Sequence, residues 1–131
     1  MKKPKNKAPK GYKFIKSEHG VEEYRLVSNG LRVLIKEVHF APIATLNVTY
    51  HVGSRNEALG HTGATHFLEH LLFKGTKKYP GKILTHILEG SGARVNATTW
   101  FDRTNYYETM PLEILPKAID IEADRMRNAA F

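Results

Sequence analysis

The first third of the chain alternates apolar and polar residues with the two-residue period of β-strands. The run EYRLV at 23–27 leads into the turn signal Ser28-Asn29-Gly30, and LRVLIKEVHF at 31–40 continues with β-branched and aromatic residues. Pro42 interrupts the pattern before IATLNVTYHV at 43–52. The connections are too short for a crossover helix, so the sequence predicts three strands in an antiparallel meander.

From about residue 62 the apolar period becomes that of a helix. Gly75 ends the first predicted helix, whose apolar positions form one stripe: Ala64, Phe67, Leu68, Leu71 and Leu72. We expect this helix to bury the stripe and to direct its polar side away from the hydrophobic layer. A second helix lies between Pro80-Gly81 and Gly90, with apolar positions at Ile83, Leu84, Ile87 and Leu88.

Two more strands and a third helix complete the pattern. The strands are predicted over 92–100 and 103–109, and the helix follows Pro111, which is tolerated in a first helical turn. The order β-β-β-α-α-β-β-α predicts an α+β fold, with helices packed on one face of a largely antiparallel sheet.

The charge of the chain is concentrated near its N-terminus. The 131 residues are 41% hydrophobic and 25% charged, as in an ordinary globular domain, and the net charge is +7. Residues 1–16 hold seven lysines and no acid, and the remainder is balanced. We therefore predict a basic, flexible tail over residues 1–20. A role in contacting anionic partners has no aromatic or motif support, and neither nucleic acid nor membrane is expected as a partner.

Two features missing from the sequence exclude classes of function. The chain has no cysteine, which excludes disulfides, zinc–thiolate sites, iron–sulfur clusters and cysteine nucleophiles. No apolar run approaches the roughly 18 residues of a membrane span. The N-terminal segment does not follow the pattern of a secretory signal, which favours a cytoplasmic location.

The sequence HFLEH at 66–70 places two histidines and a glutamate on the first predicted helix. His66 and His70 are four residues apart, so both imidazoles lie on one face and can reach a single metal ion. Glu69 is too close to His70 to be a comfortable third ligand, but it is well placed to accept a proton from an activated water. This is the H-x-x-E-H signature of one class of zinc peptidases. Taken alone, the motif is also compatible with a surface helix that carries two exposed histidines.

Three blocks of sequence resemble the insulinase/pitrilysin family of zinc peptidases, family M16. The blocks are VGSRNE at 52–57, GATHFLEHLLFKGT at 63–76 and VNATTWFDRTNYYETMP at 95–111. The resemblance covers about Val33–Phe131 and lies in the N-terminal part of the family's first domain. It implies the two-layer α+β fold of that family and a zinc-dependent endopeptidase, with Zn²⁺ as cofactor and a peptide or protein as substrate.

The resemblance also implies roles for single residues. His66 and His70 would be the zinc ligands, and Glu69 the general base for the water that attacks a peptide carbonyl. Asn96 and Ala97 match the family's Asn-Ala pair, which lies on the strand beside the site. The edge of that strand binds the substrate as an added strand. Three further matches are expected to support the strand that follows: Asp102, Thr104 and Tyr106.

Some parts of the family's site are missing from this sequence. A catalytic zinc normally has three protein ligands, and the third one in the family is a glutamate that would fall beyond Phe131. Three acids within the chain are the alternatives, although the resemblance supports none of them: Glu108, Glu113 and Glu122. The family's second domain is missing as well. We therefore expect 21–131 to be a truncated peptidase domain, inactive alone, whose partner is the remainder of a parent peptidase and whose uncovered apolar surface favours self-association.

Two other functions are compatible with parts of this pattern. One is a non-catalytic scaffold of the same fold that binds peptides or protein partners; family members of that kind typically lack the His/Glu triplet, which is intact here. The other is S-ribosylhomocysteine lyase, which has a similar fold and a His-x-x-x-His helix. Its site needs a cysteine ligand, which this chain lacks.

Overall fold

The computed structural model describes residues 8–131, apart from the side chains of residues 82–85. Residues 1–7 of the predicted tail, and the side chains of Ile83 and Leu84 in the predicted helical stripe, lie outside the described part. The chain divides into two compact units, one up to Ala41 and one from Pro42 to Phe131. Each is described by itself.

The first unit is a three-stranded antiparallel sheet. Its strands are β1 (Tyr12–Glu18), β2 (Val21–Leu26) and β3 (Arg32–Lys36), and they pair in that order. The predicted turn at residues 28–30 joins β2 to β3. Within it, the backbone N–H of Leu31 donates a 3.0 Å hydrogen bond to Asn29 Oδ1.

Strand β1 occupies part of the segment predicted as a flexible tail. Phe14 of β1 packs edge-on against Tyr24 of β2, with ring centroids 5.6 Å apart. Tyr12 and Phe14 alternate with lysines, so the strand period is present although lysine dominates the composition. A two-residue turn at His19-Gly20, both with positive φ, lets β1 return directly into β2.

The second unit is built on another three-stranded antiparallel sheet, in the order β4 (Ile43–Tyr50), β6 (Thr104–Pro111), β5 (Arg94–Thr99). The prediction that the third strand extends the meander is wrong, because β4 pairs with β6 over its whole length. The sequence between β3 and β4 lacks a tight turn and contains Pro42, so local pairing ends there and β4 finds a partner far along the chain.

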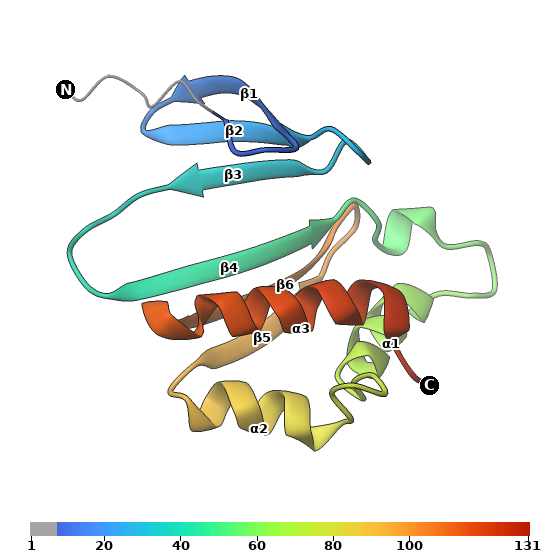
Figure 1. Ribbon diagram of the computed structural model, residues 1–131. Coiled ribbons are helices and arrows are strands. Elements are labelled where there is room, and N and C mark those ends of the chain that lie inside the picture. The colour runs from blue at the N-terminus through green and yellow to red at the C-terminus, as the bar shows by residue number, and fades with distance from the viewer. Residues whose placement is uncertain (1–7) are drawn as a thin grey trace. The chain divides into compact units, whose positions relative to one another are not determined.

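Three helices pack on this sheet (Figure 1): α1 (Ala64–Leu72), α2 (Lys82–Gly90) and α3 (Leu115–Asn128). Helix α1 contacts β5 and β6, α2 contacts β5, and α3 contacts β4 and β6. Two short 3-10 turns, η1 (Ser54–Asn56) and η2 (Leu112–Ile114), precede α1 and α3. Every second residue of β6 is buried on the helix-covered face. The predicted α+β class is confirmed, with antiparallel sheets and helices packed against a sheet.

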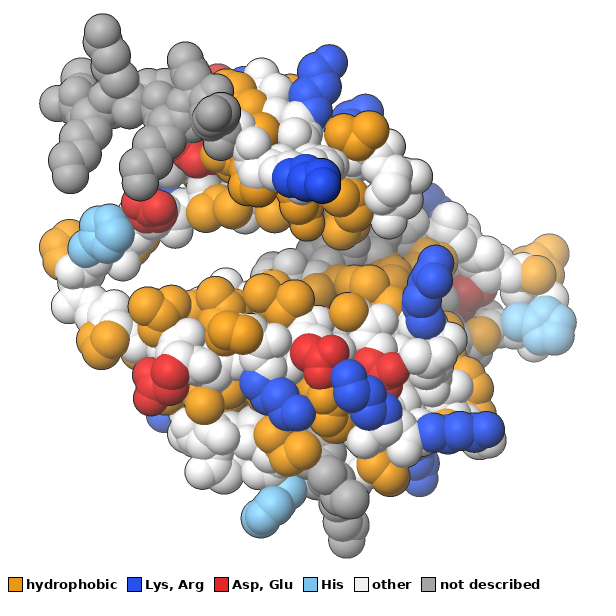
Figure 2. Space-filling model, viewed as in Figure 1, with side chains coloured by type: hydrophobic (Ala, Val, Ile, Leu, Met, Phe, Trp, Pro, Cys, Tyr) orange, Lys and Arg blue, Asp and Glu red, His pale blue; other side chains and the backbone are white. Residues whose placement is uncertain are grey.

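The hydrophobic core of the second unit lies between the sheet and helices α2 and α3. Its buried members are Tyr79, Leu88, Ala93, Met110, Ala118 and Ile121. Full burial of each large apolar side chain contributes about 1.5–3 kcal/mol. Helix α1 supplies none of these residues, so the helix that carries the HFLEH sequence is held by other contacts. Many apolar side chains remain at the surface of both units, as the orange patches of Figure 2 show.

Candidate metal centre

Helix α1 begins at a carboxylate supplied by the loop before it. The two oxygens of Glu57 accept hydrogen bonds from the backbone N–H groups of Thr65 and Gly63, at 2.9 and 2.8 Å. Both bonds lower the pKa of the Glu57 carboxyl, and the bond from Thr65 has the larger effect. Gly63 has φ +92°, which favours glycine. A negative charge at this end also complements the helix dipole.

The same loop is held close to the turn between β5 and β6. The backbone N–H groups of Ser54 and Arg55 donate to the carbonyls of Trp100 and Phe101, at 3.1 and 2.7 Å. At Gly53 an added Cβ would lie 2.1 Å from the Trp100 carbonyl oxygen, so only glycine fits. The loop therefore fixes the start of α1 relative to the end of β5.

His66 and His70 converge on one point of the α1 surface. Their Nε2 atoms are 3.1 Å apart, and both side chains are exposed. Two nitrogen ligands of a tetrahedral zinc ion, each about 2.0–2.1 Å from the metal, are separated by about 3.3–3.4 Å. The pair therefore fits two ligand positions of a zinc site.

No third side chain of a ligand type lies with this pair in the described part of the chain. Among residues 8–131, no group of three His, Cys, Asp or Glu side chains is positioned to hold a metal ion. The described residues thus bring two imidazole nitrogens together at this point of α1.

Glu69 is buried, although its polarity suggests a position exposed to solvent. It is the buried residue of this helix, at 6% exposure, and its Oε2 accepts a hydrogen bond from the hydroxyl of Thr99 in β5. Thr104 lies 3.4 Å from the Thr99 hydroxyl and donates to the Val52 carbonyl at 3.0 Å. The carboxylate is therefore held by a hydroxyl chain beneath the helix.

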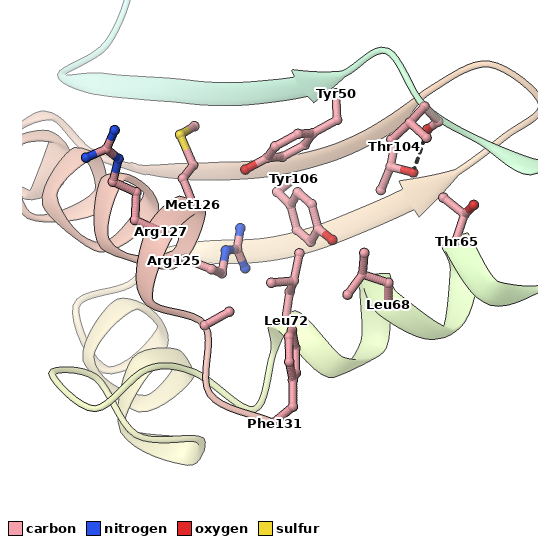
Figure 3. Close-up of a pocket in the computed structure, with 12 residues that line it drawn as sticks. Tyr50, Thr65, Leu68, Leu72, Thr104, Tyr106, Arg125, Met126, Arg127 and Phe131 are labelled. Atoms are coloured by element: carbon pink, nitrogen blue, oxygen red, sulfur yellow. Dashed lines mark hydrogen bonds between the residues drawn. The ribbon is translucent and has the colours of Figure 1, made fainter. Parts of the chain in front are cut away.

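The apolar stripe of α1 is not buried as predicted. Phe67 is 64% exposed and Leu68 is 44% exposed, whereas Glu69 points into the sheet. Leu68 and Leu72 line a cavity of about 380 Å³ instead. Figure 3 shows both side chains directed toward Tyr106, with Phe131 below Leu72 in this view. The expectation failed because the hydrogen bond to Thr99 takes the sheet-facing position that a stripe residue would fill.

A smaller cavity of about 250 Å³ lies beside the first histidine. Its walls include His66, Thr99, Trp100 and Phe101. The rings of Trp100 and Phe101 contact each other edge-on, with centroids 5.3 Å apart, and both are more than half exposed. This cavity gives an apolar and aromatic surface next to a predicted ligand.

The predicted substrate residues Asn96 and Ala97 lie on β5, which is an edge strand of the described sheet. Ala97 is buried on the helix-covered face, in register with Tyr106 of β6. Asn96 is exposed on the other face, and its Oδ1 accepts a 2.9 Å hydrogen bond from the Ala97 backbone N–H. The strand therefore brings Ala97 beneath α1 but not the Asn96 side chain.

Two of the three alternative acids lie in the protein interior, away from the histidine pair. Glu108 and Glu122 are buried around Arg125, which donates to Glu122 at 2.6 Å and lies 4.0 Å from Glu108. Burial, reinforced by Glu122, raises the pKa of Glu108 to about 9. Glu113 is exposed in η2. None of the three joins His66 and His70 in a ligand group within the described residues.

Arg125 has a role that sequence reasoning missed. It is 2% exposed, and its guanidinium lies 4.1 Å from the Tyr106 ring centroid. Burial raises the pKa of Tyr106, so its phenol stays neutral. Thr104 donates to the Val52 carbonyl, and Tyr106 is buried in β6. Thr99 and Glu57 were also missed; an acid just before a predicted helix was the available signal for Glu57.

In the described part of the chain, no helix is long and apolar enough to cross a membrane.

Comparison with known proteins identifies a family for most of this chain. Residues 32–131 match the model of the family described as insulinase (peptidase family M16). A zinc protease of Streptomyces coelicolor is 39% identical over 115 residues, which are 86% of this chain and 25% of that protein. Human mitochondrial cytochrome b-c1 complex subunit 1 is 42% identical over 106 residues, 81% of this chain and 22% of that protein.

Solved structures share the fold. The crystal structure of pitrilysin superposes with a TM-score of 0.79 at 29% identity, covering 91% of this chain and 14% of that one. The chain thus spans about a quarter or less of the length of these relatives.

Proposed function

Because the chain belongs to the insulinase family, peptidase family M16, we propose that it forms the metal-binding portion of a zinc-dependent endopeptidase. The observation that carries the proposal is the convergence of His66 and His70 Nε2, 3.1 Å apart, beside the buried carboxylate of Glu69. A surface helix with two unrelated histidines would need neither the convergence nor a buried acid between them.

The two histidines would hold zinc through Nε2. When bound, zinc supplies Lewis acidity, which polarises a peptide carbonyl and lowers the pKa of water. Glu69 acts as the general base: it accepts the proton of the attacking water and passes it to the leaving amine. The Thr99 hydroxyl holds Oε2 of that carboxylate, and no hydrogen bond among the described residues engages Oε1.

The substrate in this proposal is a peptide that adds to the free edge of β5 at Asn96 and Ala97. An edge strand offers main-chain hydrogen bonds that depend little on side chains. The aromatic cavity beside His66, lined by Trp100 and Phe101, would take a side chain of the same peptide.

The isolated chain is proposed to be inactive by itself. It supplies two ligands in its described part, and it matches about a quarter of the relatives' length. The third ligand and a second domain would come from the remainder of a parent peptidase. A cytoplasmic location is part of the same proposal.

Metal binding by the purified chain tests the proposal. We expect zinc to bind one-to-one, with both H66A and H70A lowering the affinity in competition with a chelator. H61A is the matched control, since His61 is exposed just before α1. Wild-type affinity in both H66A and H70A would overturn the assignment of the ligands.

A second candidate is a non-catalytic scaffold of the same fold. It is favoured by the 42% identity to a protein named as a subunit of a cytochrome b-c1 complex. E69Q in the full-length parent separates the two functions. A peptidase loses hydrolysis and keeps zinc and peptide binding, whereas a scaffold shows no hydrolysis that the substitution could remove.

A further inference from the structure

The two oxygens of the Glu69 carboxyl group have different surroundings. Oε2 accepts a hydrogen bond from the Thr99 hydroxyl, and the residue as a whole is buried. Oε1 accepts no hydrogen bond among the described residues, yet it is not one of the buried polar atoms that lack a partner. This oxygen therefore reaches the surface of the chain. One oxygen of the carboxyl group is held, and the other is not.

The β5–β6 hairpin directs the Thr99 hydroxyl toward α1. Side chains alternate along a strand, so Thr99 lies on the same face as Ala97, which is buried on the helix-covered side. Thr99 also pairs with Thr104 of β6 in the register of the ladder. Threonine is branched at Cβ, which restricts its χ1 angle, so the hydroxyl keeps one direction.

Each hydroxyl in this group has one proton, and the contacts indicate where each proton goes. Thr104 donates to the Val52 carbonyl at 3.0 Å, whereas its oxygen lies 3.4 Å from that of Thr99. Thr99 donates to Glu69, which makes Oε2 an acceptor. A proton placed on Oε2 would weaken this bond, so a proton that arrives at Glu69 binds Oε1.

These contacts are complete within the second unit. Val52, Glu69, Thr99 and Thr104 all belong to it, and Glu69 and Thr104 are 6% and 4% exposed. The orientation of the Glu69 carboxyl group is therefore set by residues of this chain and needs no group from outside it.

Building on the proposed function, we infer that Thr99 is a positioning residue for the general base: its hydroxyl orients the Glu69 carboxylate so that Oε1, not Oε2, exchanges the proton. Oε1 takes a proton from the attacking water as the water oxygen bonds to the peptide carbonyl carbon. The same proton passes to the peptide nitrogen as the C–N bond breaks. Thr99 neither gains nor loses a proton in these steps, because it acts only through Glu69.

A matched set of variants separates the hydroxyl from the shape of the side chain. T99V keeps the size and the branched Cβ of threonine and removes the hydroxyl. T99S keeps the hydroxyl and removes the methyl group. T98V is the control, because Thr98 lies on the opposite face of the same strand, where its hydroxyl donates to Asn105 Oδ1 at 2.8 Å.

The first measurement needs neither zinc nor hydrolysis. Three-bond NMR couplings of the Glu69 side chain in the 131-residue chain report whether it occupies one rotamer or several. We expect one rotamer in the wild type, T98V and T99S. T99V should show averaged couplings, because a buried oxygen that has lost its donor is costly. Zinc affinity, measured by competition with a chelator, should be the same in all four proteins.

The second measurement is hydrolysis of a peptide by the full-length parent. T99V should lower kcat by about 10- to 100-fold while KM stays constant, because the peptide binds as before and the base is misaligned. T99S should recover most of kcat, and T98V should match the wild type. A purely structural role of Thr99 would instead lower zinc affinity and the free energy of unfolding together with kcat.

Each measurement can overturn the inference. A single Glu69 rotamer in T99V, or wild-type kcat in the T99V parent, would show that Thr99 does not orient the base. A T99S parent as slow as T99V would show that the hydroxyl is not what matters. A wild-type parent that hydrolyses no peptide would overturn the proposed function itself and the catalytic role of Thr99 with it, and the rotamers distinguish that failure from the others.

Discussion

Two carboxyl groups share one guanidinium in the interior of the second unit. Glu108, Glu122 and Arg125 are all nearly inaccessible to solvent, and several of their polar atoms have no partner among the described residues. A single positive charge can compensate one buried carboxylate but not two. The raised pKa of Glu108, about 9, follows from burial first and then from the nearby Glu122. Glu108 is therefore neutral at pH 7.

This arrangement predicts how stability depends on pH. The folded pKa of Glu108 lies above that of an unfolded glutamate, so the native state binds the extra proton. The stability that Glu108 contributes is then fully present below the pKa of the unfolded glutamate and is lost as pH rises toward 9. E108Q should match the wild type near pH 4 and be more stable by more than about 1 kcal/mol near pH 8. Urea unfolding of both proteins across this range is the measurement.

The exposed Glu113 supplies the control. The free energy of unfolding of E113Q should differ from that of the wild type by the same amount at every pH. A constant difference between E108Q and the wild type from pH 4 to 8 would mean that Glu108 is ionised in the folded protein, against the neutral form argued above.

At this scale the sequence predicted that the two histidines share one face of a helix, but it did not predict the environment around them. Spacing alone places His66 and His70 on one helical face, and the structure brings their nitrogens together. It could not predict that Glu69 is buried, because that depends on Thr99, which belongs to a strand far along the chain. The role of Arg125 could not be predicted for the same reason: its acidic partner Glu108 and the Tyr106 ring lie on β6.

At the scale of single elements, α1 depends on Glu57 for its start. The helix adds no residue to the core cluster, and its first N–H groups are satisfied by that carboxylate. E57A should therefore speed amide exchange at Gly63 and Thr65 and weaken zinc binding, because His66 lies in the first turn. E57Q keeps a hydrogen-bond acceptor without the charge, so its amide exchange rates and zinc affinity should lie between those of the wild type and E57A. Exchange measured residue by residue by NMR checks this, with E113A as control.

The pH dependence of this cap is opposite in sign to that of Glu108. The pKa of Glu57 is lowered by the N–H groups that it binds. Its contribution to stability is therefore present above the pKa of the unfolded glutamate and is lost as pH falls through the lowered pKa of the folded state. Exchange at Gly63 and Thr65 that is unchanged in E57A would show that another group caps the helix.

Local periodicity predicted the helices and the β5–β6 pair well. The order of α1, α2, β5, β6 and α3 agrees with the predicted order, because each has its own apolar period and glycine or proline boundaries. Pairing was less predictable. Whether β4 joins β3 or β6 is decided by contacts distant in sequence, and lysines hid the alternation in β1. Pro111 ends β6 and precedes η2 rather than opening the last helix.

At the scale of the whole molecule, the fold and the candidate site draw on different parts of the chain. The hydrogen bonds that hold the start and the buried face of α1 lie within residues 52–104: the Glu57 cap, the Thr99 hydrogen bond and the Thr104 bond to Val52. Among its described residues, the first unit has one buried apolar side chain, Tyr24, and a three-stranded sheet with so little burial is marginally stable by itself.

A shortened chain of residues 42–131 should therefore keep the metal centre. We expect its unfolding free energy to lie within about 1 kcal/mol of the full chain, because the core cluster is complete within it. Its zinc affinity and its amide protection at Thr65 should be unchanged, since Glu57 and Thr99 are both retained. Urea unfolding, chelator competition and hydrogen exchange on the two proteins provide the comparison. A loss of several kcal/mol, or of the protection at Thr65, would mean that the first unit takes part in ordering α1, and the site would then have to be assigned to the chain as a whole.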